Sequence, residues 1–221
     1  FGTNNVDTCA RVCHSPTGYG LKMTLGESAG TQTFDSVMHT DVVIVMGANP
    51  SAAHPVFASR LKRRLRQGAR LIVIDPRQTE LVSSPHIQAD YHLPLRPGTN
   101  TAMLTAMAHV IVTENLVNEA YVAERCDTAA FNEWRSFVSQ PQNSPEAMAE
   151  ICGVSADDIR GAARLYATGG NGSIYAVRRS DYVEVDPRWG HDLSFPYRMV
   201  QAGRRAVYEP AARAFEKPTP S

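Results

Sequence analysis

The sequence lacks an excess of charge of either sign. Lysine and arginine together number 22, aspartate and glutamate also number 22, and the formal net charge at pH 7 is zero. Electrostatic attraction to nucleic acids and anionic membranes depends on a surplus of basic side chains. We therefore expect neither a nucleic acid nor a charged membrane surface to be the main partner of this chain.

Long apolar runs and a disulfide framework are absent as well. No apolar stretch reaches the ~20 residues with which a helix crosses a bilayer, so we predict no membrane insertion. Four cysteines among 221 residues are too few for a disulfide-stabilised fold and favour a reducing compartment, here predicted to be the cytoplasm. The chain begins at Phe1 instead of methionine, so we expect a fragment of a longer protein.

Two continuous apolar runs predict strands that are buried on both faces of a parallel sheet. Residues 41–47 and 71–75 are dominated by β-branched side chains. Between them, residues 55–67 place apolar side chains at helical spacing among arginines that we expect to be solvated. Strand, helix and strand in this order form a right-handed βαβ unit. The predicted fold class is therefore α/β, with a parallel sheet of βαβ units.

Further elements are predicted up to about residue 168. Residues 87–95 have the pattern of a shorter third strand, and residues 101–115 that of an amphipathic helix. Met103 and Met107 in that helix are expected to fill the core. The other predictions are a short helix at 34–38, a partly helical stretch at 121–137, a helix at 159–166 with a capping box at 155–158 and an end at Gly169-Gly170, and a loop at 21–33.

Three loops follow the predicted strands, and ligands of open α/β sheets bind at the strand ends. In the first loop, Gly47 would let a backbone approach a pyrophosphate, and Asn49 and Ser51 would bind phosphate or cap a helix. His54 in this loop is either a site residue or simply the start of a helix. The loop has no GxGxxG pattern, so an ordinary NAD site is not supported.

The second and third loops add charged side chains to the same predicted edge. Asp75 could accept hydrogen bonds from ribose hydroxyls or a purine amine, or could only begin a turn before Pro76. Arg77 could meet a phosphate. Arg96, Gly98 and Asn100 in the third loop could hold a further phosphate or a base edge.

A cysteine–histidine pair lies near the start of the chain. Cys13 follows Cys9 by four positions and immediately precedes His14. A thiolate is a soft metal ligand, and an imidazole beside a metal can accept a proton near neutral pH. Buried packing is the alternative role for such a cysteine, and two cysteines alone are a weak zinc or iron–sulfur signal. Gly18 and Gly20 predict a turn after the pair.

With these residues in view, the chain resembles the catalytic subunits of molybdenum- or tungsten-dependent formate dehydrogenases. The resemblance covers about residues 1–170, and its loops follow in the order and spacing of that family. The segments that carry it are Asn5 to Pro16, Gly47 to Pro50, Asp75 to Arg77, Leu95 to Asn100, and Ser155 to Thr168.

The resemblance implies oxidation of formate to carbon dioxide at a molybdenum or tungsten ion held by a bis-molybdopterin guanine dinucleotide cofactor. It implies that Cys13 ligates the metal and that His14 accepts the proton. Electrons would then pass to an iron–sulfur cluster, which the family carries before this loop, and to electron-transfer subunits. The sheet-edge residues implied to bind the guanine dinucleotide are Gly47, Asn49, Pro50, Ser51, His54, Asp75, Pro76, Arg77, Arg96, Gly98 and Asn100.

The last part of the chain resembles a different family, the acceptor half of family 2 inverting glycosyltransferases. Residues 186–193 and 203–210 carry this second resemblance, which implies that Asp192 is a catalytic base. The Asp-x-Asp metal motif of the nucleotide-sugar half is absent before Asn171. We therefore predict a partial nucleotide-binding domain at 1–170 and a glycosyltransferase-like segment at 171–221, with a non-catalytic βαβ module as a third interpretation.

Overall fold

A computed structural model of the chain describes residues 2–5, 15–25 and 33–176. Four parallel strands form its main sheet: β1 (Val42–Met46), β2 (Arg70–Ile74), β5 (Tyr91–Leu93) and β6 (Gly172–Ala176). Their spatial order is β5-β2-β1-β6. The predicted α/β class with a parallel sheet is confirmed.

The order of the strands reverses direction beside β1. From β1 the chain steps to β2 and then to β5, and it returns after a long helical stretch to pair β6 with the other side of β1. Val45, for example, lies between Val73 of β2 and Tyr175 of β6. In sheets of this kind the crevice for a ligand opens at the carboxyl ends of the strands, at the point of reversal.

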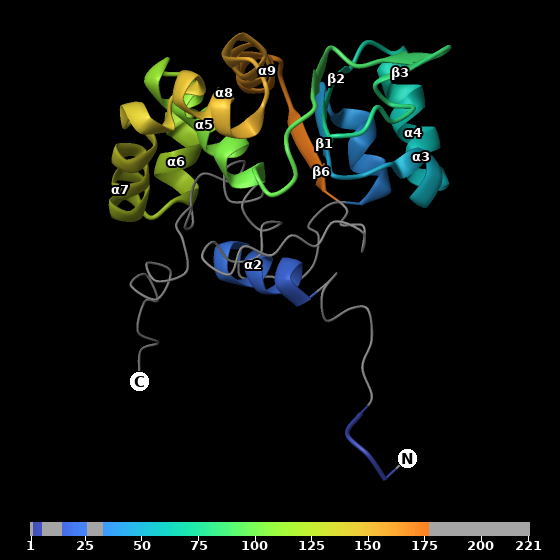
Figure 1. Ribbon diagram of the computed structural model, residues 1–221, viewed down its shortest axis with the longest axis horizontal. Helices are drawn as coiled ribbons and strands as arrows, with labels where there is room; N and C mark the ends of the chain where they lie inside the picture. The colour runs from blue at the N-terminus through green and yellow to red at the C-terminus, as the bar shows by residue number, and fades with distance from the viewer. Residues whose placement is uncertain (1, 6–14, 26–32, 177–221) are drawn as a thin grey trace.

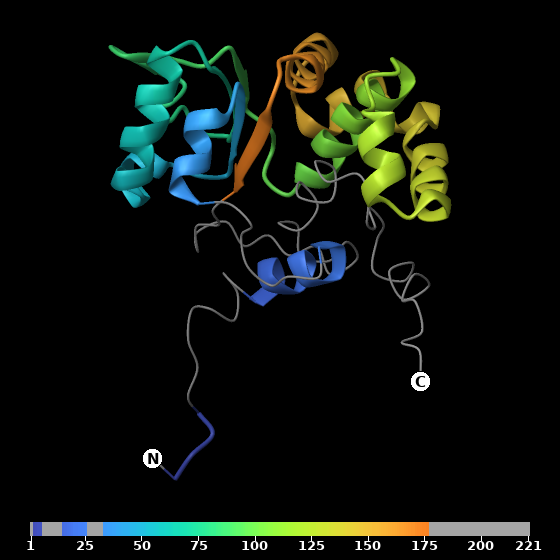
Figure 2. The same cartoon turned by 180° about the vertical axis from the view of Figure 1, so that it is seen from behind.

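Both faces of the sheet are covered by helices (Figures 1 and 2). One face carries the 3-10 helix η1 (Phe34–His39), α3 (Pro50–Ala53) and α4 (Pro55–Arg66). The opposite face carries α5 (Asn100–Thr113), α8 (Pro145–Cys152) and α9 (Ala156–Thr168), with α6 (Glu119–Arg125), α7 (Thr128–Val138) and the 3-10 helix η2 (Pro141–Asn143) packed beyond them. Helix α2 (Ser15–Leu25) lies below these layers in both views.

Alternation along the strands explains the continuous apolar runs. Ile44 and Ile72 pack with residues of α5 and α9, whereas Val45 and Val73 pack with residues of η1 and α4. Because successive side chains of a strand point to opposite faces, a strand between two helical layers needs an apolar residue at every position. The predicted filling of the core by Met103 and Met107 is confirmed, since both are buried against this sheet.

Helix ends follow the predicted capping chemistry. The Ser155 hydroxyl accepts a hydrogen bond from the Asp158 backbone N–H at 3.1 Å and donates one to the Asp158 carboxylate at 2.7 Å. Ser155 is therefore confirmed as the cap of α9, while the Asp158 carboxylate bonds to the Ser155 hydroxyl and not to the Ser155 backbone N–H of a full capping box. Gly169 takes the position after the last residue of that helix.

The predicted third strand divides in two. Only Tyr91–Leu93 joins the main sheet, while β4 (Ile87–Gln88) pairs antiparallel with β3 (Ser83–Ser84). Asp90 separates the two pieces, because its carboxylate accepts hydrogen bonds from the Leu71 backbone N–H and the Arg70 side chain. The Asp90 backbone N–H also donates to the Leu71 carbonyl oxygen at 2.8 Å, so both the main chain and the side chain of Asp90 bind β2 at this point.

Two further local predictions differ from the structure. Gly18 and Gly20 lie inside α2, not in a turn, and the predicted loop at 21–33 begins with the last residues of that helix. Residues 172–176 form β6 in the same sheet as β1. The domain boundary at 170 stays a prediction, because residues 177–221 lie outside the described ranges.

Gly169 marks a close approach between α9 and β1. A Cβ at this position would lie 2.3 Å from Cγ2 of the buried Val42 and 2.6 Å from the Leu165 carbonyl oxygen. We expect Gly169→Ala to lower the free energy of unfolding by about 1–3 kcal/mol, because neither a central-strand side chain nor a helix carbonyl can yield freely. Urea unfolding followed by circular dichroism measures this change.

Thr168→Ala is the matched control for that experiment. Thr168 is exposed and precedes Gly169 directly, so its replacement should change stability by no more than about 0.5 kcal/mol. Equal stability of Gly169→Ala and the wild type would contradict the close approach.

Candidate functional site

The loops after β1 and β2 lie side by side at the carboxyl edge of the sheet. The backbone N–H of Gly47 donates to the carbonyl oxygen of Ile74, the last residue of β2, at 2.9 Å. Gly47 has a φ of 59°, and a Cβ added there would meet no atom within 4 Å. The backbone at this corner can therefore be approached closely by a ligand.

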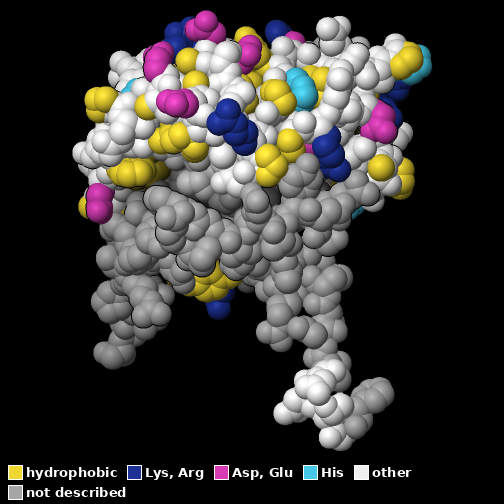
Figure 3. Space-filling view, in the orientation of Figure 1, with side chains coloured by type: hydrophobic (Ala, Val, Ile, Leu, Met, Phe, Trp, Pro, Cys, Tyr) yellow, Lys and Arg dark blue, Asp and Glu magenta, His cyan; other side chains and the backbone are white. Residues whose placement is uncertain are grey.

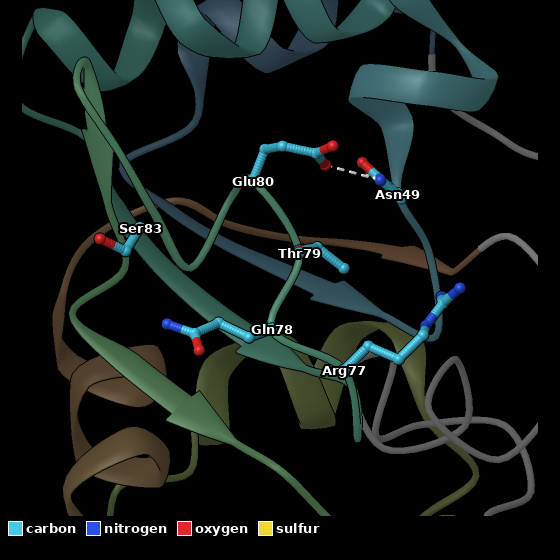
Figure 4. Close-up of a pocket in the computed structure, with 6 residues that line it drawn as sticks. All are labelled: Asn49, Arg77, Gln78, Thr79, Glu80 and Ser83. Atoms are coloured by element: carbon cyan, nitrogen blue, oxygen red, sulfur yellow. Dashed lines mark hydrogen bonds between the residues drawn. The ribbon is translucent and has the colours of Figure 1, made fainter.

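The first loop points its amide group toward the second. Asn49 precedes α3 and donates from Nδ2 to the Glu80 carboxylate at 2.7 Å, and it makes no side-chain cap (Figure 4). Pro50 is the buried first residue of α3. His54 is exposed and lies between α3 and α4, so its position as a helix-start residue is confirmed.

The second loop is built on a buried carboxylate. Oδ1 of Asp75 accepts hydrogen bonds from the Arg77 backbone N–H at 2.8 Å and from Arg77 Nε at 3.0 Å, and Oδ2 accepts one from Arg77 Nη2 at 2.9 Å. The bond to the backbone N–H two residues on is that of an Asx turn, so Asp75 does begin a turn at Pro76.

A hollow of about 350 Å³ lies between these two loops. Figure 4 shows Asn49 and Glu80 on one side of it and Arg77 below Asn49. The residues that line the hollow are Asn49, Arg77, Gln78, Thr79, Glu80 and Ser83. Of the residues predicted to bind a cofactor, the structure thus brings Asn49 and Arg77 to one hollow, with Gly47, Asp75 and Pro76 at the same edge of the sheet.

Three buried polar atoms at this edge have no hydrogen-bond partner among the residues that the structure describes. They are Oδ1 of Asn49, Oγ of Ser51 and Oγ1 of Thr79. Thr79 lines the hollow although only 7% of its surface is exposed. Buried polar groups are nearly always hydrogen-bonded, so unsatisfied atoms beside a hollow indicate a polar partner there, either a ligand or water.

Glu80 presents a carboxylate at the hollow. A hydrogen bond from its own backbone N–H, together with the bond from the Asn49 amide, holds the pKa of Glu80 below its ordinary value. The group is therefore ionised at neutral pH, and an ionised carboxylate only accepts hydrogen bonds. This edge can bind N–H or O–H donors of a ligand through Glu80 and anionic groups through Arg77.

The third loop, which contains Arg96, is hydrogen-bonded to helix α8. Nη1 of Arg96 donates to the Glu150 carbonyl oxygen at 2.6 Å, and its backbone N–H donates to the Cys152 carbonyl oxygen at 2.8 Å. Gly98 has a φ of 81°, and Asn100 is the first residue of α5. The Arg96 side chain is thus directed to α8, and the structure does not bring it to the hollow of the first two loops.

Sequence reasoning missed five residues of this edge. Gln78, Thr79, Glu80 and Ser83 follow the Asp-Pro-Arg turn, and no motif singled them out. His92 of β5 places its Nε2 2.9 Å from the Asp75 carbonyl oxygen. Only the position of residues 78–80 directly after the Asp-Pro-Arg turn could have pointed to them.

Cys13, His14 and Asp192 lie outside the described residues, so their roles stay predictions. Within the described ranges no group of three or more His, Cys, Asp or Glu residues could hold a metal ion. Burial raises the pKa of the Cys152 thiol to about 11, which makes this cysteine inert at neutral pH.

The surface adds two general observations. Basic and acidic side chains are interspersed on the face that Figure 3 shows. In the part of the chain that the structure describes, no helix combines the length and the apolar character needed to span a bilayer.

Comparisons with known proteins place the chain among molybdopterin enzymes. The family described as molybdopterin oxidoreductase matches residues 1–213. Formate dehydrogenase H of Escherichia coli (strain K12) is 43% identical over 174 residues, which cover 79% of this chain and 23% of that protein. A nitrate reductase of Symbiobacterium thermophilum is 35% identical over 173 residues, which cover 74% of this chain and 22% of that protein.

A solved structure is similar as well. Acetylene hydratase from Pelobacter acetylenicus superposes with a TM-score of 0.62 at 27% identity, over 78% of this chain and 22% of that protein. This chain thus spans under a quarter of the length of each of these three proteins, as shares of 23%, 22% and 22% show.

The hydrogen bond between Asn49 and Glu80 predicts how the pKa of Glu80 changes when Asn49 is replaced. Asn49→Ala removes a donor that stabilises the ionised carboxylate, so we expect the pKa of Glu80 to rise toward its ordinary value while staying below it through the backbone bond. Carbon-13 NMR titration of the Glu80 carboxyl group measures this shift. Asn132→Ala, at an exposed position of α7, is the control and should leave the titration unchanged; an unshifted Glu80 in Asn49→Ala would count against the bond.

Proposed function

Because this chain belongs to the molybdopterin oxidoreductase family, we propose that it is the nucleotide-binding part of a formate dehydrogenase. The observation that carries the proposal is a hollow with unsatisfied polar atoms at the carboxyl edge of the sheet, in a chain 43% identical to a formate dehydrogenase. The proposed whole protein oxidises formate to carbon dioxide in the cytoplasm, with electron-transfer subunits as partners.

The residues at this edge fit the guanine dinucleotide form of the molybdopterin cofactor. A volume of about 350 Å³ lies within the range of small-molecule sites, about 300–1,000 Å³. The open corner at Gly47 and the cation of Arg77 suit a pyrophosphate, which is anionic. The unpartnered oxygens of Asn49, Ser51 and Thr79 suit the hydroxyl and amine donors of a nucleoside.

Glu80 favours guanine over adenine in this proposal. The hydrogen-bonding edge of guanine offers two adjacent N–H donors, at N1 and N2, and an ionised carboxylate accepts both. Adenine carries an acceptor at N1, which would face the carboxylate oxygens with like partial charge. Asn49 strengthens this selection, because its amide donates to the Glu80 carboxylate and holds it at the hollow.

The chemistry assigned to the start of the chain completes the proposal. The cofactor, when bound, supplies a molybdenum or tungsten ion that takes up two electrons. Formate becomes carbon dioxide by losing these two electrons and one proton, so the site needs a base. Cys13 would ligate the metal through its thiolate, and a ring nitrogen of His14 would accept the proton. In the whole protein, an iron–sulfur cluster would accept these two electrons.

Nitrate reduction is the second candidate activity, because a nitrate reductase is 35% identical to this chain. The two activities run in opposite electronic directions, since formate gives up electrons and nitrate takes them. In the whole protein, reduction of an oxidised viologen dye by formate supports the first. Oxidation of a reduced dye by nitrate without any activity toward formate supports the second.

Selectivity for guanine gives a first test. We expect GDP to bind this chain at least about 10-fold more tightly than ADP, because hydrogen bonds to a charged group contribute about 1.5–3 kcal/mol. Glu80→Gln should remove most of this difference. Isothermal titration calorimetry measures both affinities, and Glu146→Gln, an exposed carboxylate of α8, is the matched control. Equal affinities for GDP and ADP in the wild type would exclude the proposed role of Glu80.

Metal content gives a second test. In a host that makes the cofactor, the purified chain should contain molybdenum or tungsten, and Cys13→Ser should lower that content. Cys126→Ser removes a half-buried cysteine of the helical layer and should change nothing. Metal analysis by mass spectrometry decides the question: absence of both metals, here and in the whole protein, or an unchanged content in Cys13→Ser, contradicts the ligand role of Cys13.

A further inference from the structure

We propose that Asp75 is a positioning residue, whose buried carboxylate holds the guanidinium of Arg77 at the hollow while His92 anchors the backbone of Asp75. This inference rests on the proposed function for the identity of the ligand, but the contacts between the three residues are properties of the chain itself. Their roles differ: Arg77 lines the hollow, and Asp75 and His92 act through it.

The burial of Asp75 excludes a direct contact with ligand. The residue is 0% exposed, and its side chain is 1% exposed. An ionised carboxylate so far from water is stable only if it is paired and hydrogen-bonded. Arg77 supplies this compensation through its backbone N–H, its Nε and its Nη2. A ribose hydroxyl, the partner that the sequence suggested, has no route to these oxygens.

The same contacts orient Arg77. Nε and Nη2 bind the two different oxygens of one carboxylate, and such a two-point pairing fixes the plane of the guanidinium as well as its position. The Arg77 side chain is 32% exposed, so the pair connects the interior of the sheet with the hollow. A lysine at this position would carry the charge without the fixed plane.

His92 anchors the base of this arrangement from the neighbouring strand. It lies opposite Val73 in the pairing of β2 with β5, and its Nε2 is 2.9 Å from the Asp75 carbonyl oxygen. A carbonyl oxygen only accepts, so Nε2 carries the proton of this bond. The peptide unit of Asp75 is therefore held by a side chain from β5, while its carboxylate holds Arg77.

The positioning role is tested without any ligand by nitrogen-15 NMR of arginine side chains. The Nε–H signal of Arg77, identified as the one that Arg77→Lys removes, should exchange with water at least about 10-fold more slowly than that of the exposed Arg63. In Asp75→Asn this protection should fall, because the amide loses the charge and one acceptor oxygen. His92→Leu should lower it to a smaller extent.

Asp90→Asn is the matched control. Asp90 binds Arg70 Nε and the Leu71 backbone N–H at the opposite, amino end of β2. Its replacement should speed exchange at Arg70 and leave Arg77 protected. If Asp75→Asn does not fold, the wild type still decides the question, because an Arg77 Nε–H that exchanges as fast as that of Arg63 overturns the proposal.

Binding of GDP then tests whether Asp75 acts through Arg77. Asp75→Asn and Arg77→Lys should each weaken GDP binding at least about 10-fold, and the double variant should bind no more weakly than Arg77→Lys alone. Losses that multiply in the double variant would overturn the positioning role. The two proposals can also fail separately. If the wild type binds no GDP, but its Arg77 Nε–H is protected and that of Asp75→Asn is not, the proposed function is contradicted and the positioning role is supported.

Discussion

The parallel pairing of β1 with β2 is the constraint on which the candidate site depends. Both strands are buried between two helical layers and run in the same direction, so the loops that follow them must leave the sheet at one edge. The bond from the Gly47 N–H to the Ile74 carbonyl extends this pairing one step beyond β1. That register brings the loops to one edge, and the bonds from Asn49 to Glu80 and from Arg77 to Asp75 then place these side chains around one hollow.

Sequence patterns predicted the parts of the fold whose cause is local. A strand covered on both faces is apolar at every position, so β1 and β2 were visible as uninterrupted runs, and the serine cap of α9 lies within four residues. Strand β6 was not predicted, because it carries the polar Ser173 at a buried position. That hydroxyl lies 2.8 Å from the Thr40 hydroxyl, a partner that only the folded sheet supplies. The same holds for Asp90, which interrupts the third strand by bonding to β2.

In the candidate site, too, the sequence predicted what has a local cause and not what depends on tertiary contacts. The sequence indicated which loops would meet, because loops after parallel strands share an edge, but it did not indicate where each side chain would point. Arg96 is as cationic as Arg77, yet its guanidinium binds a carbonyl at the end of α8, which lies 54 residues further along the chain. Glu80 follows no recognisable motif and gains its place through the amide of Asn49. Both outcomes depend on tertiary neighbours, which residue type and spacing do not reveal.

The two edges of the sheet differ in a way that supports a ligand at only one of them. At the amino edge the Asp41 carboxylate binds Arg64 on one oxygen and the Asn171 backbone N–H on the other, and Arg64 bonds through both terminal nitrogens. Its Nε is the unsatisfied atom there within the described residues. At the carboxyl edge, oxygens of Asn49 and Thr79 lack partners beside an open hollow, and Oγ of Ser51 in α3 lacks one as well. Because unsatisfied buried groups destabilise a fold, the three at the end where α/β proteins bind ligands argue that a polar partner, a ligand or water, completes this edge.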